Sequence, residues 1–427
     1  MTYEESLEYL DNLGKFGINL GLKRIEKLLE LMDHPERRFK TIHVTGTNGK
    51  GSTTAMLASI LTAAGIKTGM YTSPHLANYT ERMMIDGQEI SPMQFGLAIE
   101  YTSQFVEKLI QQGIDHPTEF EVLTAAAFYY FASCGVEYAM IEVGLGGLLD
   151  STNVIVPEVT VITNVTMDHI DKCGSTITDI AGHKAGIIKD GVPIITAAKG
   201  RGLDVIKHVA NSKSAKLYIE GHDFSAQFAG RVEQREKVVI KVKGQGTIGT
   251  FIVNLLGHHQ VENCALAVMA ALVLAKKEQR ITFSALQNGL LKVCWPGRFE
   301  VIPGKPTIII DGAHNQDGAR SLRENLNEFY PNTEIVFLLG ILQDKDVTAI
   351  VRELIGAADQ VVVVAPLSQR AGRPEDIARV IKAAHVETAD SIRQGLVRVH
   401  MLAGDNSVIC IAGSLYLIGA ARGIICK

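Results

Sequence analysis

The sequence lacks the features that mark membrane-spanning, secreted and fibrous proteins. Its longest uninterrupted apolar run, Cys264–Ala275, has twelve residues. Such a run is too short to span a bilayer and is typical of a buried helix. The first residues contain no basic segment followed by an apolar one, so we expect no secretion signal. Low-complexity segments and periodic repeats are absent as well. We therefore expect an ordinary globular protein with no membrane partner.

Two further scarcities narrow the range of partners. The six cysteines are scattered and include no Cys-x-x-Cys pair, which argues against a disulfide framework or a zinc site and favours reduced thiols. The formal net charge is −4, and without a basic surplus we expect no nucleic-acid partner. A local cluster of cations would still be enough to bind small anionic substrates. We expect a cytoplasmic, monomeric enzyme that acts on small molecules.

What the sequence does contain is an alternation of strand-like and helix-like segments over 427 residues. The length predicts two or three domains. Apolar runs predict buried strands at 41–45, 68–72, 138–143, 160–164 and 192–196. This alternation predicts an α/β fold with a mostly parallel sheet that helices cover on both faces.

Two changes of texture divide the chain further. Residues 215–253 form short alternating segments separated by glycines, which predicts a small antiparallel sheet appended to the first domain. Residues 295–297, Trp-Pro-Gly, interrupt any regular element. Beyond them the alternation restarts with strand-like runs at 307–311, 334–339, 360–364 and 407–412. We therefore expect one domain over residues 1–296 and a smaller, Rossmann-like α/β domain over residues 297–427.

A glycine-rich loop follows the first predicted strand. Residues 46–52 read Gly-Thr-Asn-Gly-Lys-Gly-Ser and precede a helix that we expect to begin at Ser52. Glycines let backbone N–H groups approach a phosphate, the helix start favours an anion, and Lys50 adds positive charge. The match to the standard phosphate loop is imperfect, because Val44 replaces its first glycine and Gly51 separates Lys50 from Ser52. The pattern favours nucleotide binding over an ordinary glycine-rich turn.

The loop alone does not identify how the nucleotide is used. A GTPase would need the guanine-reading sequence Asn-Lys-x-Asp. The nearest string, Gln343–Asp346, lacks the asparagine. A GTP switch is therefore disfavoured, while an ATP-using enzyme and a nucleotide-dependent scaffold both stay open at this point.

Six further strings follow in order along the chain. They lie at residues 140–153, 168–169, 183–189, 295–300, 310–315 and 413–416. Together with the glycine-rich loop, they resemble the folylpolyglutamate synthase and dihydrofolate synthase family, a branch of the ATP-dependent Mur-type amide ligases. The resemblance covers nearly the whole chain, and it explains the unusual loop, whose form is the one that this family uses. It implies a Mur-ligase-like fold: an N-terminal phosphate-loop domain, a smaller C-terminal domain, and ATP bound between them.

The resemblance implies an ATP-dependent ligase that adds L-glutamate to folates through an acyl phosphate, with ATP and Mg²⁺ as cofactors. The strings at 73–76 and 79–82 resemble bifunctional bacterial members, which also join glutamate to 7,8-dihydropteroate. A monofunctional folylpolyglutamate synthase is one alternative. A cell-wall Mur ligase is another, but such enzymes usually carry an extra N-terminal domain, and only about forty residues precede the loop.

The resemblance also assigns nucleotide and metal contacts. It implies ATP contacts for Thr47, Asn48, Gly49, Lys50, Gly51, Ser52, Asn263, Arg298 and Asp311. Asn263, Arg298 and Asp311 alternatively are capping residues or members of interdomain salt bridges. The implied magnesium ligands are Ser73, Glu142 and His169. From the residues alone these are a turn serine, a strand-end carboxylate and a hydrogen-bonding histidine, and imidazole is an unusual ligand for magnesium.

Catalytic roles are implied for Lys50, Lys184 and His314. Lys184 resembles the lysine that the family carbamylates, and this modification requires a neutral amine and therefore a lowered pKa. From the residues alone, Lys184 is a surface lysine or a phosphate clamp.

Substrate contacts are implied for two single residues and three segments. Arg82 is suited to bind a carboxylate bidentately, and Ser414 resembles a residue near the incoming glutamate. Pterin contacts are implied for segments that are otherwise ordinary helix starts and loops. These residues are Leu20, Gly21, Leu22, Thr118, Glu119, Phe120, Glu121, Leu149, Asp150 and Ser151.

Overall fold

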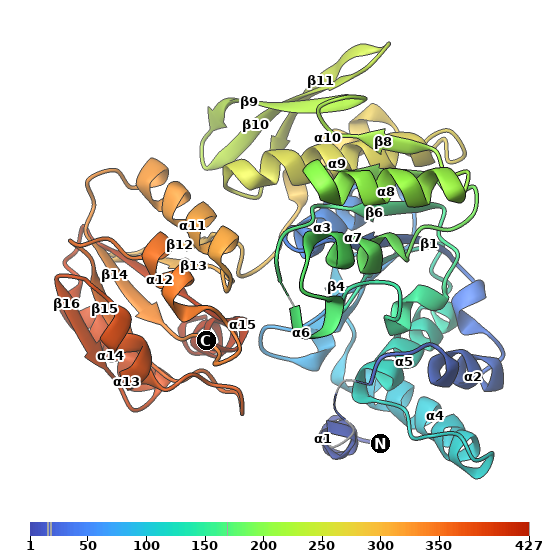
Figure 1. Cartoon of the computed structure of the whole chain (residues 1–427), viewed down its shortest axis with the longest axis horizontal. Helices are drawn as coiled ribbons and strands as arrows, with labels where there is room; N and C mark the ends of the chain where they lie inside the picture. Colours follow the sequence, from blue (N-terminus) through green and yellow to red (C-terminus); the bar gives the residue numbers. More distant parts are fainter. Residues whose placement is uncertain (15–16, 18, 169, 427) are drawn as a thin grey trace. The chain divides into compact units, whose positions relative to one another are not determined.

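The computed structural model describes residues 1–14, 17, 19–168 and 170–426. Contacts divide the chain into two compact units, which are described separately below (Figure 1). The large unit comprises Met1–Ser73, Tyr79–Asn254 and Val261–Val293, and the small unit comprises Pro74–Asn78, Leu255–Gln260 and Cys294–Lys427. In the part of the chain that the structure describes, no helix is both long enough and apolar enough to cross a membrane.

The large unit is built on a mixed sheet whose central strands are parallel. In the described residues its spatial order is β4 (Gln88–Glu89), β3 (Met83–Ile85), β2 (Thr68–Tyr71), β5 (Tyr138–Glu142), β1 (Lys40–Thr45), β6 (Val159–Ile162), β7 (Ile194–Thr196) and β8 (Leu217–Ile219). Six strands run parallel to one another, namely β2, β5, β1, β6, β7 and β8. Strands β3 and β4 add an antiparallel pair at one edge. The parallel sheet expected from the apolar runs is confirmed.

Helices cover both faces of this sheet because its strands are apolar on both sides. The helices of the large unit are α1 (Tyr3–Leu13), α2 (Lys23–Leu31), α3 (Lys50–Ala63), α4 (Pro92–Gln111), α5 (Glu119–Ser133), α6 (Ile170–Cys173), α7 (Ile177–Ala185), α8 (Gly200–Ser212) and α10 (Phe283–Lys292). Short 3₁₀ helices are η2 (Pro35–Arg37), η3 (Tyr79–Arg82) and η4 (Ser151–Val154). Helix α9 (His258–Leu274) contains all but the last residue of the twelve-residue apolar run, and that part is mostly buried, as expected.

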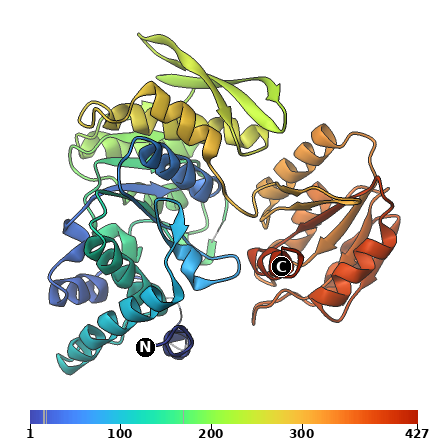
Figure 2. The same cartoon turned by 180° about the vertical axis from the view of Figure 1, so that it is seen from behind.

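Two neighbouring helices show how closely the elements pack. Helices α1, α2, α4 and α5 share one core with Ala139 and Ile141 of β5. Helix α3 lies beside α10, as the blue and gold helices of Figure 2 show. A Cβ at Gly289 would come within 2.4 Å of the backbone of Ile60, and the Ser59 hydroxyl donates to the Gly289 carbonyl at 2.7 Å. This close approach requires glycine at position 289.

A three-stranded antiparallel sheet is appended to the large unit. It consists of β9 (Phe224–Val232), β10 (Arg235–Val242) and β11 (Gly246–Val253), with β10 in the middle. The alternation along residues 215–253 predicted this sheet, but the assignment of its first segment was wrong. Leu217–Ile219 forms β8, which pairs parallel with β7. Since α8 separates these two parallel strands, they form a β–α–β crossover unit rather than a hairpin.

The small unit contains a second sheet, again mostly parallel. Its spatial order in the described residues is β12 (Glu300–Ile302), β13 (Thr307–Ile310), β17 (Val408–Ala412), β14 (Ile335–Leu339), β15 (Gln360–Val363) and β16 (His385–Thr388). Only β12 runs antiparallel to its neighbour. The alternating side chains of the strands face two separate cores. One contains α11 (Gln316–Phe329), α12 (Val347–Leu354) and α13 (Pro374–Val380), and the other α14 (Ile392–Leu402) and α15 (Leu415–Ile425).

Candidate active site

The glycine-rich loop lies at the carboxyl edge of the large sheet. It follows β1, which pairs with β5 on one side and β6 on the other. The chain leaves β1 through α3 toward β2 on the β5 side, whereas β6 and β7 extend the sheet in the opposite direction. Ligands of open α/β sheets bind at such a reversal, outside the carboxyl ends of the strands. The topology therefore places the loop where a ligand site is expected.

Two glycines of the loop are required by their surroundings. A Cβ at Gly46, whose φ is +153°, would lie 1.8 Å from the Thr163 hydroxyl oxygen. A Cβ at Gly49, whose φ is +81°, would lie 2.3 Å from Oδ1 of Asn263. The loop therefore touches the loop after β6 on one side and α9 on the other. This contact brings Asn263, an expected ATP contact, to the phosphate loop.

The helix after the loop begins earlier than the sequence suggested. Helix α3 starts at Lys50, two residues before Ser52, with Gly49 as its N-cap residue. Gly51 and Ser52 are therefore buried in its first turn. The left-handed conformation of Gly49 lets the helix begin directly behind the loop, so that free N–H groups are aimed at the loop.

Residues that follow β6 hold the phosphate loop in place, and sequence analysis missed them. The Asn48 N–H donates to Asn164 Oδ1 at 2.9 Å, and the Thr163 hydroxyl donates to the Asn48 carbonyl at 2.6 Å. Thr47 and Thr166 exchange two further bonds of 3.1 Å. The only feature of the sequence that points to these residues is a largely polar segment, residues 163–166, directly after a buried strand. Its spacing matches no phosphate-binding motif, because these residues act on the loop rather than on a ligand.

Lys50 is folded onto its own loop. Its Nζ donates to the carbonyl of Gly46 at 3.0 Å and to that of Thr47 at 3.1 Å. A lysine in this position carries its charge into the mouth of the loop. The site therefore combines N–H groups with a cation, the pairing that binds phosphate.

Lys184 lies in α7 and is buried, with 5% of its surface exposed. Burial and, to a lesser extent, the nearby charge of Lys50 lower the pKa of Lys184 to about 7, against the opposing effects of Cys173 and Asp168. The neutral amine is therefore available near neutral pH, as a carbamylated lysine requires. The surface-lysine alternative is excluded by this burial.

The candidate magnesium ligands lie partly within the described residues. Glu142 is buried at the carboxyl end of β5, and Ser73 follows the neighbouring strand β2 at the same edge. His169 lies outside the described residues. No group of three or more His, Cys, Asp or Glu side chains forms a metal cluster in the described part. A carboxylate and a hydroxyl on adjacent strands nevertheless fit the oxygen preference of Mg²⁺.

The strings at 140–153 and 183–189 interlock. The Leu148 N–H donates to the His183 carbonyl at 2.7 Å. A Cβ at Gly147 would lie 2.7 Å from that carbonyl oxygen and 3.3 Å from Cα of Lys184, and a Cβ at Gly186 would lie 2.5 Å from Cβ of Leu148. The glycines of both strings therefore let the loop after β5 lie directly against the helix that carries Lys184.

The three segments expected to contact a pterin meet in the structure. The Gly21 N–H donates to the Leu149 carbonyl at 3.4 Å, and the Arg24 guanidinium donates to Glu121 at 3.0 Å. Glu121 also closes the capping box of α5, in which its carboxylate accepts from the Thr118 N–H at 2.7 Å. These contacts join the start of α2, the start of α5 and the loop before η4.

The same segments reach the loop after β5. A Cβ at Gly144 would lie 2.6 Å from the Phe120 ring. Asp150 is buried and accepts from the Leu145 N–H at 2.8 Å and from the Thr152 N–H at 3.0 Å; burial raises the pKa of its carboxyl group. Leu149 leaves 38% of its surface exposed, which offers an apolar area for a flat ring. Leu20 and Leu22 are half-buried before α2, and Ser151 begins η4.

Arg82 closes η3 and is tied to the start of α5 through one tyrosine. Its guanidinium lies 5.1 Å from the centre of the Tyr79 ring, which is a cation–π contact. The Tyr79 hydroxyl donates to Glu119 at 2.9 Å. Burial and Glu119 raise the pKa of Tyr79, so the phenol stays protonated and keeps donating. Glu119 therefore holds the tyrosine ring on which the Arg82 guanidinium lies, by accepting a hydrogen bond from its hydroxyl.

The remaining expected residues lie in the small unit. Asp311 follows β13 and accepts from the N–H groups of Phe299 and Ala313, each at 2.8 Å. Burial raises the pKa of Asp311, whereas the nearby charge of Arg298 lowers it. A Cβ at Gly312 would lie 2.9 Å from the Arg298 guanidinium. Arg298 and Asp311 therefore form one group at the carboxyl edge of this sheet.

His314 and Ser414 lie at the same edge on adjacent strand ends. The His314 ring nitrogen Nδ1 lies 2.8 Å from the Gly312 carbonyl oxygen. Ser414 follows β17, the parallel neighbour of β13, and its hydroxyl caps α15 by accepting from the Leu417 N–H at 3.1 Å. The small unit thus brings together all four of its expected residues.

Comparison with known proteins identifies the class of the fold. The Mur ligase middle domain matches residues 44–271, and the Mur ligase, glutamate ligase domain matches residues 297–415. The first match covers most strands of the large sheet, and the second covers the sheet of the small unit. The chain therefore has the architecture of an ATP-dependent ligase of the Mur type.

The similarity to individual relatives is more specific. The chain is 35% identical over 434 residues to the dihydrofolate synthase/folylpolyglutamate synthase of Bacillus subtilis, covering 99% of this chain and 98% of the relative. It is 36% identical over 426 residues to the folylpolyglutamate synthase of Lacticaseibacillus casei, again covering 99% and 98%. The Mycobacterium tuberculosis folylpolyglutamate synthase complexed with ADP and AMPPCP matches with a TM-score of 0.91 at 32% identity, covering 100% of this chain and 99% of that chain. The chain belongs to the folylpolyglutamate synthase/dihydrofolate synthase family.

Proposed function

We propose that the protein uses ATP and Mg²⁺ to add L-glutamate to folates and also to 7,8-dihydropteroate. The observation that carries this proposal is the meeting of three distant segments, at residues 20–24, 118–121 and 149–151, around the loop after β5. That loop lies against the helix of Lys184 and one strand away from the phosphate loop. An acceptor and a nucleotide would then share one edge of the sheet.

The chemistry requires a carboxylate to become electrophilic. A carboxylate oxygen of the acceptor attacks the γ-phosphorus of ATP, ADP leaves, and an acyl phosphate forms. The amine of glutamate then attacks the acyl carbon, the bond to phosphate breaks, and the amine loses a proton. Most of the barrier is lowered by positioning the groups and by neutralising the phosphoryl oxygens.

Several residues of this chain are suited to those tasks. The phosphate loop and Lys50 would bind the phosphates. Ser73 and Glu142 would hold Mg²⁺ together with His169, and the ion would supply further positive charge to the phosphoryl oxygens. A carbamate on Lys184 would turn a buried cation into an anion beside that ion.

The domain roles follow from the same assignment. Residues 1–296 would bind ATP and the acceptor, and residues 297–427 would bind the incoming glutamate through Ser414 and His314. Arg298, Asp311 and Asn263 would contact the nucleotide. A monomer working in the cytoplasm, with no nucleic-acid or membrane partner, completes the proposal.

Dihydropteroate as a second acceptor is supported by the relatives. The Bacillus subtilis relative carries both activities in its name, whereas that of Lacticaseibacillus casei carries only folylpolyglutamate synthesis. In this chain all three pterin segments are present and in mutual contact. This favours the bifunctional alternative.

One experiment tests the proposal directly. Purified protein is incubated with ATP, Mg²⁺ and L-glutamate, and either dihydropteroate or tetrahydrofolate is added as the acceptor. Mass spectrometry should show a product heavier by one glutamate residue with each acceptor, together with ADP and phosphate. A product with tetrahydrofolate alone would exclude the second activity. No product with either acceptor would overturn the proposal.

A further inference from the structure

Two residues of the interlocked strings have no role in the reaction proposed above. Asn153 belongs to η4 and is buried, with 4% of its surface exposed. Lys189 closes the string at 183–189 and is half-buried. Both are polar, and both lie between the acceptor segments and the helix of Lys184. The hydrogen bonds of Asn153 and Lys189 show what these two polar groups do in the fold.

Asn153 bridges the two ends of the interlock. Its side-chain amide donates to the carbonyl of Leu148 at 3.0 Å and to that of Gly186 at 3.1 Å. Gly186 is the C-cap residue of α7, two positions after Lys184. One amide group thus ties Leu148, which directly precedes the acceptor loop (Leu149–Ser151), to the end of the helix that carries Lys184.

Lys189 completes the bridge from the other side. Its Nζ donates to the backbone carbonyl of Asn153 at 2.9 Å. Partial burial removes water from the ammonium group and thereby destabilises its charged form, so the pKa of Lys189 is lowered. The ion–carbonyl bond offsets that destabilisation because charge-assisted hydrogen bonds are the strong ones.

The opposite side of the acceptor loop is anchored separately. The ring nitrogen Nε2 of His43, in β1, lies 2.9 Å from the hydroxyl of Thr152. Burial lowers the pKa of His43 to about 3, so the ring stays neutral in this contact. The acceptor loop is therefore fixed to the sheet by Thr152 and to α7 by Asn153.

We propose that Asn153 and Lys189 are positioning residues that set the distance between the acceptor loop, Leu149–Ser151, and the helix of Lys184. The inference rests on the proposed function, because it assumes that this loop contacts the acceptor. Neither side chain touches reacting atoms. Their effect is to hold the acceptor in line with the groups that activate its carboxylate, and small displacements of that kind are costly to catalysis.

The test separates positioning from stability. Lys189→Met keeps an unbranched side chain that is one atom shorter and removes its donor. It is expected to raise KM for dihydropteroate about tenfold while KM for ATP changes less than about twofold, since one charged hydrogen bond is lost. Asn153→Ala is expected to raise KM for dihydropteroate and also to lower kcat about tenfold, because it frees the end of α7 beside Lys184.

Conservative and control variants complete the design. Lys189→Arg retains a charged donor and is expected to keep KM for dihydropteroate within about threefold of the original protein. The matched controls are Lys277→Met, whose exposed lysine pairs with Glu158 at 2.8 Å, and Asn12→Ala, whose exposed amide donates to the Glu8 carbonyl of the same helix at 2.9 Å. Both controls are expected to leave KM and kcat unchanged.

The outcomes are distinguishable. An unmodified protein that glutamylates neither acceptor would overturn the proposed function itself. With an active unmodified protein, an unchanged KM for dihydropteroate in Lys189→Met would overturn the positioning role. A loss of active protein with every KM unchanged would also overturn it, because a purely structural role predicts that result. A selective rise in KM, restored by Lys189→Arg, would support it even if Asn153→Ala fails to fold.

Discussion

At the scale of single residues, Lys184 shows how much of the chemistry depends on burial. The sequence alone presents a lysine among others in the string at 183–189, and its reactivity could be expected only through the family resemblance. The fold buries it and places Lys50 nearby, and these two effects lower its pKa to about 7. Neither effect is encoded locally, since both arise when α7 and the phosphate loop meet.

A pH dependence follows from this lowered pKa. Below pH 7 the amine of Lys184 is mostly protonated and does not react with CO₂, and above pH 7 it is mostly neutral. We expect a carbamate signal in ¹³C NMR with labelled bicarbonate that grows from pH 6 to pH 8 and is absent from Lys184→Ala. A signal that appears only above pH 9 would show that the amine has an ordinary pKa.

Gly46 is a second residue whose importance can be tested alone. Gly46→Ala places a methyl group where the Thr163 hydroxyl lies, so the loop has to move away from the residues that hold it. We expect affinity for a non-hydrolysable ATP analogue to fall by about 10- to 100-fold, because strained backbone positions cost about 1–3 kcal/mol. Calorimetric titration measures the affinity, and Gly65→Ala, at a turn with open space around the Cβ, controls for the loss of a positive-φ glycine.

At the scale of elements, periodicity predicted the buried parallel strands well and the short edge strands poorly. Strands β1, β5, β14 and β17 lie where the apolar runs predicted them. Strands β3, β4, β12 and β16 lie at or next to the edges of their sheets, and most of their residues are half-buried or exposed, so no long apolar run marks them. The helix start at Lys50 was missed because the cap is a left-handed glycine rather than a side-chain oxygen.

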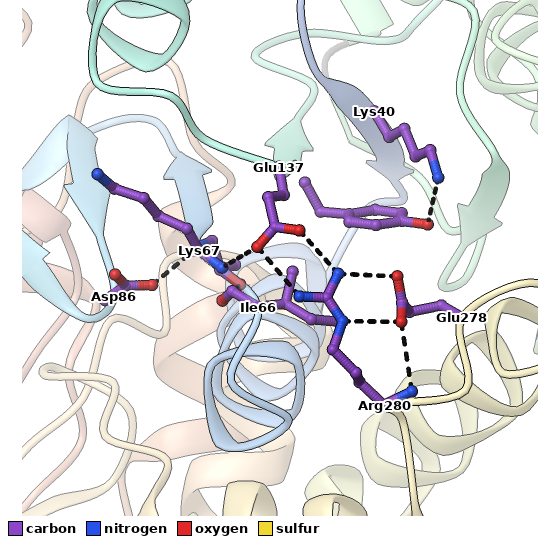
Figure 3. A network of polar contacts seen from close by, with 9 residues as sticks. Lys40, Ile66, Lys67, Asp86, Glu137, Glu278 and Arg280 are labelled. Carbon is purple, nitrogen blue, oxygen red and sulfur yellow. Dashed lines mark hydrogen bonds and ion pairs between the residues drawn. The ribbon is translucent and has the colours of Figure 1, made fainter.

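A network of ion pairs links two elements of the large unit (Figure 3). Arg280, in the connection between α9 and α10, donates to Glu137 at 2.7 Å and to Glu278 at 2.9 Å. Glu137 directly precedes β5 and also accepts from the Lys67 N–H at 3.0 Å. The network thus fastens the α9–α10 connection to the amino end of the sheet, away from the candidate site.

Arg280→Met is expected to lower the free energy of unfolding by less than about 1 kcal/mol, because the pairs are partly exposed. Hydrogen bonding to Arg280 lowers the pKa of Glu278 to about 2. The pKa in the folded state thus lies below that of the unfolded chain, so the stabilisation is complete above pH 4.5 and is lost as the pH falls toward 2. Urea denaturation at pH 7 and pH 3 measures both points. If the difference in unfolding free energy between the original protein and Arg280→Met grew toward pH 3, the assignment would be wrong. The control is Arg379→Met, which removes one exposed ion pair.

At the scale of the whole molecule, the order of the strings along the chain predicted the architecture better than composition did. The chain length left two or three domains open, whereas the seven ordered strings implied two domains with residues of the reaction in each. The structure places Arg298 and Asp311 together in the small unit and Lys50 and Lys184 in the large one. The residues that anchor the loops, such as Thr163 and Asn153, could not be predicted, because their partners lie far away in sequence.

Nucleotide binding offers a test of cooperation between the two units. If ATP is contacted by the small unit as proposed, Arg298→Ala should weaken the binding of an ATP analogue about tenfold although the phosphate loop is intact. Thermal denaturation with increasing analogue measures this, since a ligand stabilises the folded state by mass action. Arg352→Ala, an exposed arginine of the small unit, should behave like the original protein. Equal stabilisation of Arg298→Ala would exclude the contact.

The short segment Pro74–Asn78 has a consequence for how such enzymes can be recombined. Leu76 packs into one core of the small unit, and a Cβ at Gly419 would lie 1.7 Å from its carbonyl oxygen. Leu256 fills the other core, again from a segment that precedes residue 297. A chimaera joined to a relative at a single crossover near residue 296 would therefore inherit mismatched pieces of both cores. Chimaeras within this family should fold only when Pro74–Asn78 and Leu255–Gln260 come from the same parent as the C-terminal part of the chain.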